Sequence, residues 1–180
     1  LQAQIASAPG HNASNAGELQ FFTADSSSVI QQRMTIREDG YVGIGTDSPS
    51  EKLDVAGDIL INGITIGRGS GNVSSNTANG FEALRFNTTG SQNAANGYQA
   101  LRNNTTGSYN TANGSEALRF NTTGSSNTAN GYQSLLSNTT GEGNVANGFW
   151  SLRSNITGAQ NVANGYQSLY ANTTGNNNVA

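Results

Sequence analysis

Few residues of this 180-residue chain have a type and spacing suited to catalysis. The only histidine, His11, lies among small and turn-forming residues, and no acid or serine is spaced from it as in a hydrolase triad. Asp54 and Asp58 are separated by Gly57 in a pattern that predicts a solvated turn rather than an acid and base pair. Segment 67–71 is rich in glycine but lacks the Gly-Lys-Ser/Thr ending of a phosphate-binding loop. We therefore predict that the chain is not an enzyme and has no catalytic residues, metal ligands or cofactor.

Repeated side chains could instead contact a ligand. An aromatic ring followed by an amide suits the faces and hydroxyl groups of sugars, although the ring could be buried instead; such pairs are Tyr98-Gln99, Tyr132-Gln133 and Tyr166-Gln167. Paired threonines would form a hydroxyl lattice like that of ice-binding solenoids, with Ile156 as an interruption; the pairs are Thr88/Thr89, Thr105/Thr106, Thr122/Thr123 and Thr139/Thr140. Trp150 is the clearest unique residue, which makes it a candidate for a surface contact or for packing between chains.

These side chains belong to one 17-residue unit that is written six times from Asn76 onward, without insertion or deletion. The unit is Asn-x-Ala-Asn-Gly-aromatic-x-Ala/Ser-Leu-x-x-Asn-Thr-Thr-Gly-x-x, and a seventh copy begins at Asn178. So strict a period predicts a stack of identical coils, with neighbours about 4.8 Å apart. Two glycines per unit and the Asn-Thr-Thr-Gly tetrad predict two short strands, 76–79 and 81–85, joined by tight corners.

Composition alone would favour disorder, because 34% of the residues are hydrophobic and 11% are charged. The fixed phase of leucine and glycine argues against it, since a flexible linker needs no such order. The net charge is −3, and neither half has the basic patch that nucleic-acid binding requires. No apolar run approaches the ~18 residues of a membrane span, so we predict neither nucleic-acid binding nor membrane insertion.

The residues before the repeats predict short β-strands. We expect an N-terminal β segment over 1–32, a hairpin-rich β connector over 33–66 and a flexible Gly/Ser hinge over 67–75. Within the connector, Asp39-Gly40 predicts a two-residue hairpin turn, because this pair tolerates positive φ angles. Asn62-Gly63 predicts a second turn between short strands.

The segment from Arg33 to Asp58 resembles the connector of bacteriophage tail fibres and related trimeric surface fibres. The matching residues are Gly43-Ile44-Gly45-Thr46, Pro49, Leu53-Asp54-Val55 and Gly57. The 17-residue unit is similar to repeats of the same proteins, so the resemblance covers about residues 19–180. It departs from them where their repeats often read Asn-Thr-Ala-Ile-Gly, because Asn79 and its copies stand at the fourth place. Nothing in the chain resembles the self-cleaving chaperone domain in which such proteins often end.

Each predicted coil offers little apolar material for a core. Ala78 and Leu84, with their copies, would fill a thin interior, which is a poor core for one chain and favours a homotrimer. The resemblance also implies three parallel chains. An aromatic column, interrupted at Ser115, would supply the interface between chains, or else cover the interior of its own coil; it consists of Phe81, Tyr98, Tyr132, Phe149 and Tyr166. We also predict an amide ladder along the Asn79 column. Stacked arginines would repel one another, so they either splay or meet acids such as Glu82 and Glu116, and we favour a solvated ladder; the column consists of Arg85, Arg102, Arg119 and Arg153.

Together these features predict an all-β protein, with a short β-strand connector followed by a repetitive β-roll or β-helix shaft in a parallel homotrimeric fibre. The resemblance implies a shaft in a virion tail that projects a receptor-binding tip for attachment to a host cell. Expected partners are further copies of the chain, other tail or baseplate proteins, and a host glycan or protein receptor bound by regions outside these residues. The alternatives are a trimeric adhesin of the bacterial cell surface and an ice-binding or glycan-binding solenoid.

Overall fold

The computed structural model describes residues 3–9, 17–24, 26 and 29–180. Its contacts divide the chain into two compact units, Leu1–Gly57 and Asp58–Ala180. Within the described residues all regular structure is β, apart from one short 3-10 turn, Ser70–Asn72. The predicted all-β class is therefore confirmed.

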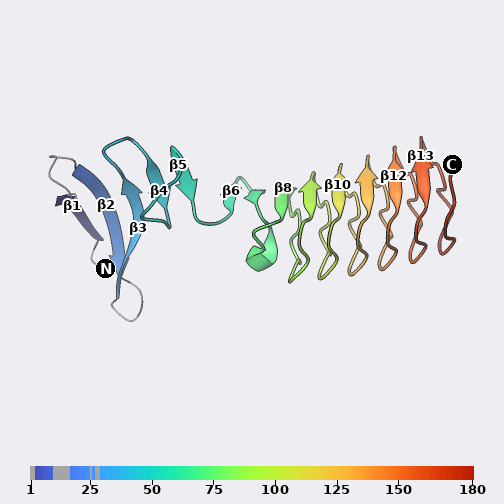
Figure 1. The fold of residues 1–180 in the computed structure, drawn as a ribbon, viewed down its shortest axis with the longest axis horizontal. Helices are drawn as coiled ribbons and strands as arrows, with labels where there is room; N and C mark the ends of the chain where they lie inside the picture. Colours follow the sequence, from blue (N-terminus) through green and yellow to red (C-terminus); the bar gives the residue numbers. More distant parts are fainter. Residues whose placement is uncertain (1–2, 10–16, 25, 27–28) are drawn as a thin grey trace. The chain divides into compact units, whose positions relative to one another are not determined.

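The first unit is a five-stranded sheet in the order β1-β2-β3-β4-β5 (Figure 1). Its strands are β1 (Ala3–Pro9), β2 (Gly17–Ala24), β3 (Ile30–Ile36), β4 (Val42–Ile44) and β5 (Leu53–Val55). Neighbouring strands are antiparallel from β1 to β4, whereas β4 and β5 are parallel. Only residues 33–57 of the predicted connector therefore lie in this unit, and residues 58–66 belong to the second one.

The turn at Asp39-Gly40 differs in length from the prediction. The nitrogen of Arg37 donates to the Tyr41 oxygen, and the Gly40 nitrogen donates back to the Arg37 oxygen, each at 2.9 Å. Residues 38–40 thus form a three-residue loop that ends on Gly40 at φ 77°, a bulged hairpin rather than a two-residue one. On β4, a Cβ on Gly43 would lie 2.4 Å from the Thr46 oxygen, so only glycine fits there.

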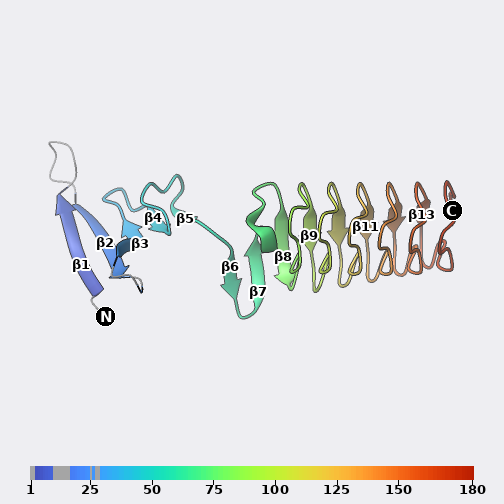
Figure 2. The same ribbon diagram turned by 90° about the horizontal axis from the view of Figure 1, so that it is seen from below.

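The second unit is an eight-stranded sheet in the order β13-β12-β11-β10-β9-β8-β7-β6 (Figure 2). The antiparallel hairpin of β6 (Ile59–Ile61) and β7 (Ile64–Gly67) turns through Asn62 and Gly63, both at positive φ, and β7 pairs with the first strand of the repeats. The parallel strands are β8 (Thr77–Phe81), β9 (Ala94–Asn96), β10 (Thr111–Asn113), β11 (Thr128–Asn130), β12 (Val145–Asn147) and β13 (Val162–Asn164).

Parallel strands pair residues that are one repeat unit apart, such as Ala78 with Ala95 and Ala112 with Ala129. The repeats therefore form a β-solenoid of about five turns, which confirms one coil per unit.

The second half of each coil is not the predicted strand. Residues 82–86 form consecutive turns after the first strand, and Glu82 and Leu84 have φ angles of 55° and 49°. These left-handed residues curl the chain, so that the adjacent side chains of Ala83 and Leu84 both point inward, which an extended strand does not allow. The curled segment is still joined to the next coil, since the Leu84 nitrogen donates to the Ala100 oxygen at 3.1 Å.

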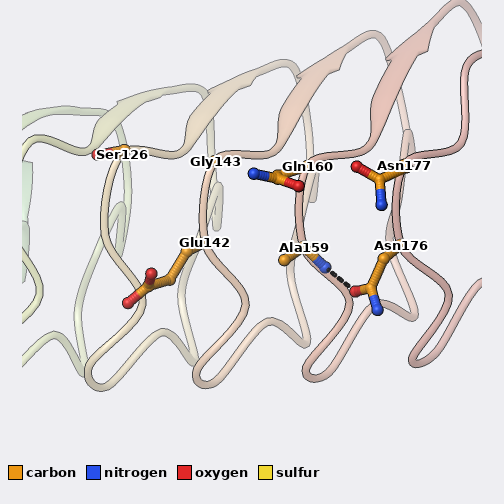
Figure 3. Close-up of a pocket in the computed structure, with 7 residues that line it drawn as sticks. All are labelled: Ser126, Glu142, Gly143, Ala159, Gln160, Asn176 and Asn177. Atoms are coloured by element: carbon orange, nitrogen blue, oxygen red, sulfur yellow. Dashed lines mark hydrogen bonds between the residues drawn. The ribbon is translucent and has the colours of Figure 1, made fainter.

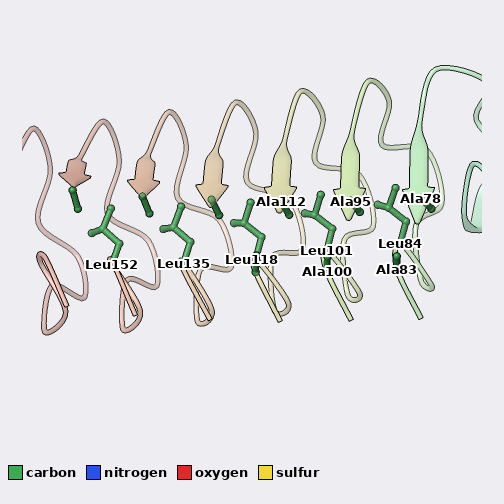
Figure 4. Packing of buried hydrophobic residues seen from close by; sticks show 14 residues of the cluster. Ala78, Ala83, Leu84, Ala95, Ala100, Leu101, Ala112, Leu118, Leu135 and Leu152 are labelled. Carbon is green, nitrogen blue, oxygen red and sulfur yellow. The ribbon is translucent and has the colours of Figure 1, made fainter. Parts of the chain in front are cut away.

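The apolar part of the interior consists of three columns, which Figure 4 shows stacked coil upon coil. The Ala78 and Leu84 columns are buried, as predicted, and the leucines from Leu84 to Leu152 are 0% exposed. The column that begins at Ala83 is also buried and was not predicted as core; alanine gives way to Ser134 and Ser151 in later coils.

Segment 67–75 packs on the first coil instead of forming a hinge. The nitrogen of Ser70 donates to the Leu84 oxygen at 3.1 Å, and the Asn87 amide donates to the Ser70 oxygen at 3.4 Å. A Cβ on Gly69 would lie 2.6 Å from that of Leu84, so the glycines allow close contact rather than flexibility. Together with the β6–β7 hairpin, this segment covers the N-terminal end of the solenoid.

Candidate functional site

Two buried ladders of asparagine side chains run through the solenoid. The sequence analysis did not predict either of them. In the first, the Asn121 amide nitrogen donates to Asn104 Oδ1 at 2.8 Å and to the Gly124 oxygen at 2.9 Å, while its oxygen accepts from Asn138. In the second, the amide oxygen of Asn110 accepts from both the backbone and the side-chain nitrogen of Asn127. Most members of both ladders are 0–2% exposed, so these amides are polar parts of the core. The signal was present as the invariant Asn of the Asn-Thr-Thr-Gly tetrad and the first Asn of each unit.

A third ladder, on the surface, matches the prediction for the Asn79 column. Asn96, Asn113, Asn130 and Asn147 each donate an amide hydrogen to the next copy at 2.8–2.9 Å. These side chains lie on the outer face of the parallel sheet and are exposed or half-buried. The ladder is therefore confirmed, but water reaches it.

The aromatic column lies on the outside of the coil and does not cover its interior. Phe81 stacks on Tyr98 with ring centroids 5.5 Å apart, and Phe149 stacks between Tyr132 and Tyr166 at 5.1 and 5.6 Å. Exposed fractions run from 39% for Phe149 to 68% for Tyr166. The rings form two stacks separated at Ser115, with one edge open to solvent.

The sequence suggested that the three glutamine amides beside these rings could bind a ligand. Two of them instead donate hydrogen bonds to acids of the neighbouring coil. Gln99 Nε2 donates to Glu82 Oε2 at 2.8 Å, and Gln133 Nε2 donates to Glu116 Oε2 at 2.8 Å. Only Gln167 is exposed. All positions of this column have positive φ.

Members of the arginine column pair with acids, whereas a solvated ladder was the favoured expectation. Glu82 pairs with Arg85 of its own coil and with Arg102 of the next, the latter at 2.5 Å, and Arg119 Nη1 lies 3.6 Å from Glu116 Oε1. Arg85 and Arg102 also lie over the Phe86 ring. The two glutamates offset part of the positive charge of the column, while Arg153 donates to Gln133 instead.

Trp150 is half-buried in a cluster of rings. Its indole nitrogen donates to Gln133 Oε1 at 2.9 Å, and its ring lies 4.6 Å from Phe149 and 6.0 Å from Tyr170, measured between centroids. Arg153 packs over the same indole at 5.5 Å from the ring centroid. The only hydrogen-bond donor of the tryptophan is therefore used within the chain, which favours packing over ligand contact.

The threonine rows do not present a complete hydroxyl lattice. The first threonine of each tetrad donates its hydroxyl to a backbone oxygen of the next coil, as Thr88 does to Thr105 at 2.8 Å and Thr105 to Thr122 at 3.0 Å. Thr139 donates in the same way to Ile156. Only the second row keeps outward hydroxyls, which weakens the ice-binding interpretation.

The two acids considered for catalysis, Asp54 and Asp58, accept hydrogen bonds from nearby loop residues. Asp54 Oδ2 accepts from the backbone and hydroxyl of Ser50, while Asp58 accepts from the nitrogens of Arg68 and Gly69. Asp54 and Asp58 fall in different compact units. His11 lies outside the described residues. Among those that are described, no group of histidines and acids could hold a metal ion.

The hollows of the solenoid surface are open and shallow. One of about 470 Å³ lies where Gly143 interrupts a column of larger side chains (Figure 3). Its lining residues are Ser126, Glu142, Gly143, Ala159, Gln160, Asn176 and Asn177. These polar groups come from adjacent coils and include no buried side chain aimed at the hollow, so they do not form a binding site.

No protein-family model matches the chain, and no curated protein or solved structure gives a significant match. Among the described residues, no helix is long and apolar enough to cross a membrane.

Proposed function

We propose that the chain is a shaft segment of a bacteriophage tail fibre or a similar trimeric appendage, which projects a receptor-binding tip toward a host cell. The observation that carries the proposal is the unbroken bonding from coil to coil. Backbone hydrogen bonds and three amide ladders link successive coils, while each coil contacts only its neighbours. Such a structure sets length and stiffness without a unique site. The resemblance of the connector and of the repeat points to the same role.

A shaft should grow in length with the number of its units. We expect duplication of residues 76–177, six complete units, to lengthen the particle by roughly 29 Å at unchanged cross-section, since each coil adds about 4.8 Å. Small-angle X-ray scattering measures both quantities. A control chain with a Gly/Ser insert of equal length should gain a flexible tail and no rigid length. Growth in cross-section without growth in length would contradict the shaft.

Within this proposal, the outer apolar stripe is the interface of a parallel homotrimer. Ile61, Ile64 and Phe81 are direct partners across β6, β7 and β8, and cross-strand partners share one face of a sheet. They are 52%, 44% and 42% exposed and continue into the stacked rings that begin with Phe81 and Tyr98. An apolar stripe of this kind is typical of an interaction surface.

Phe149→Ser should weaken the trimer. Serine already occupies this column at Ser115, so the coil tolerates it, while the change removes a ring that stacks on Tyr132 and Tyr166. We expect a loss of trimer at micromolar concentration in sedimentation equilibrium, because interface aromatics contribute strongly to association. Phe120→Ser is the matched control: Phe120 is also 39% exposed but lies outside the column. A folded monomer for the unchanged chain at the same concentration would refute the interface.

The rival within the same proposal is a trimeric adhesin of a bacterial cell surface with the same solenoid. The full reading frame distinguishes the two, because a membrane anchor indicates the cell surface and a chaperone domain of the tail-fibre kind indicates the virion. In both cases the receptor site is expected outside these residues.

A further inference from the structure

Asn-Gly pairs occur seven times in the sequence, and the structure places them in two environments. One pair, Asn62-Gly63, forms the turn between β6 and β7. The other six occupy the same phase of the solenoid, from Asn79-Gly80 to Asn164-Gly165. Identical chemical groups can therefore be compared within a single chain.

An Asn-Gly pair can lose its amide without an enzyme. The backbone nitrogen of the glycine attacks the side-chain Cγ of the asparagine, and the side-chain nitrogen leaves as ammonia, which gives a five-membered succinimide. Water then opens the ring to aspartate or isoaspartate, so that one amide and one water become one carboxylic acid and one ammonia. The reaction needs a glycine N–H that can give up its proton and a side chain that can turn toward it. Glycine offers no side chain to hinder the attack.

The solenoid restrains both groups in its four central Asn-Gly pairs, in which the glycine nitrogen and the asparagine amide are hydrogen-bonded; these pairs begin at Asn96, Asn113, Asn130 and Asn147. The attacking nitrogen of Gly114 donates to the Asn96 backbone oxygen at 2.9 Å, and that of Gly131 donates to the Asn113 oxygen at 2.8 Å. The Asn113 side chain is held at both ends, because it accepts from Asn96 and donates to Asn130. The next coil also lies directly over the glycine, since a Cβ on Gly114 would meet the Gly131 oxygen at 2.5 Å.

The hairpin pair has none of these restraints. Asn62 is exposed and Gly63 is half-buried, and neither the Asn62 amide nor the Gly63 nitrogen makes a hydrogen bond to the described residues. A Cβ on Gly63 would meet only the edge of the Phe81 ring, at 3.4 Å, and no overlying backbone.

We propose that Asn62 is the site of spontaneous deamidation in the folded chain, and that the hydrogen bonds of the solenoid keep Asn96, Asn113, Asn130 and Asn147 unreactive. Isoaspartate at position 62 adds a backbone atom to a two-residue turn. The altered hairpin pairs with β8 through β7, so the change loosens the cover over the N-terminal end of the solenoid.

The test follows conversion in the intact folded chain during incubation at mildly alkaline pH. Cleavage after arginine and lysine separates Asn62 in peptide 53–68 from Asn96 in 86–102 and Asn113 in 103–119, and fragment masses locate each new acid. We expect conversion at Asn62 to be faster than at Asn96 or Asn113 by at least about tenfold, because the solenoid pairs must first break two hydrogen bonds of ordinary net strength. Equal rates in the folded chain would overturn the proposal.

Two further measurements assign the difference to structure. In denaturant the same pairs should convert at similar rates, and a persistent lag at Asn96 and Asn113 would also overturn the proposal. Asn130→Ala removes the acceptor of the Asn113 amide, so conversion at Asn113 should rise several-fold while Asn62 stays unchanged, with circular dichroism to confirm that the solenoid remains folded. No rise at Asn113 in the folded variant would mean that the ladder does not protect.

Discussion

Gly114→Ala is expected to unfold the middle of the solenoid. Gly114 has φ 140°, and a Cβ there would lie 2.5 Å from the Gly131 oxygen and 2.7 Å from its carbonyl carbon, closer than side-chain carbons approach backbone. The coil that contains Gly131 cannot move away without breaking its backbone hydrogen bonds to the coil that contains Gly114. Overpacking and backbone strain together should reduce the free energy of unfolding by about 3–5 kcal/mol, measured by urea unfolding followed with circular dichroism.

Gly143→Ala is the matched control in the same solenoid. Gly143 also has positive φ, at 66°, but the nearest atom to its added Cβ is 3.6 Å away. Five equivalent positions with positive φ carry side chains: Gln92, Tyr109, Ser126, Gln160 and Asn177. The expected loss is about 1–2 kcal/mol. If the two variants lost equal stability, the close approach of the next coil would not explain why every repeat unit has glycine at the position of Gly114.

The period of the repeat was sufficient to predict the coil, because strict spacing leaves one way to stack identical units. It also predicted which residues point inward at the simplest positions, Ala78 and Leu84, since small and medium apolar side chains suit a thin interior. The shape of the second half of each coil could not be predicted in this way. Leucine and glutamate disfavour left-handed φ, yet Leu84 and Glu82 adopt it because stacking against the next coil outweighs local preference.

The role of the glycines was also only partly predictable. They were expected to serve tight corners, but Gly90 and its copies do not have positive φ. A Cβ on Gly90 would lie 2.3 Å from the Gly107 oxygen and 2.7 Å from the amide atoms of Asn87 and Asn104. Glycine is thus required there for space beside a buried ladder, a reason that appears only when the coils are stacked.

On the candidate ligand surface, the position of the aromatic rings could be predicted from the sequence, but the hydrogen bonds of the neighbouring glutamine amides could not. Aromatic residues at one phase had to share one side of the solenoid, so a column followed from the sequence. Whether the amides of Gln99 and Gln133 are free for a ligand depends on acids one coil away, Glu82 and Glu116. A sequence pattern does not show such partners, because they are neighbours only after folding.

Asn121→Ala should be far more destabilising than Asn113→Ala, although both residues belong to amide ladders. Asn121 is 0% exposed, and its removal leaves Asn104 Oδ1 without a donor and takes one acceptor from Asn138 Nδ2. The oxygen of Gly124 keeps a bond from Asn110, so two groups lose partners in the dry interior. At about 1–3 kcal/mol for each unpaired buried group, we expect a loss of roughly 2–4 kcal/mol.

Asn113 makes two comparable bonds on the surface, to Asn96 and Asn130. Water can replace both bonds at this exposed position, so the expected loss falls to about 1 kcal/mol or less. Thermal and urea unfolding of the two variants, prepared in parallel, measure the difference directly. Equal losses would mean that ladder bonds stabilise the solenoid in proportion to their number, whether they are buried or exposed. The two buried ladders would then contribute no more to stability than the surface ladder.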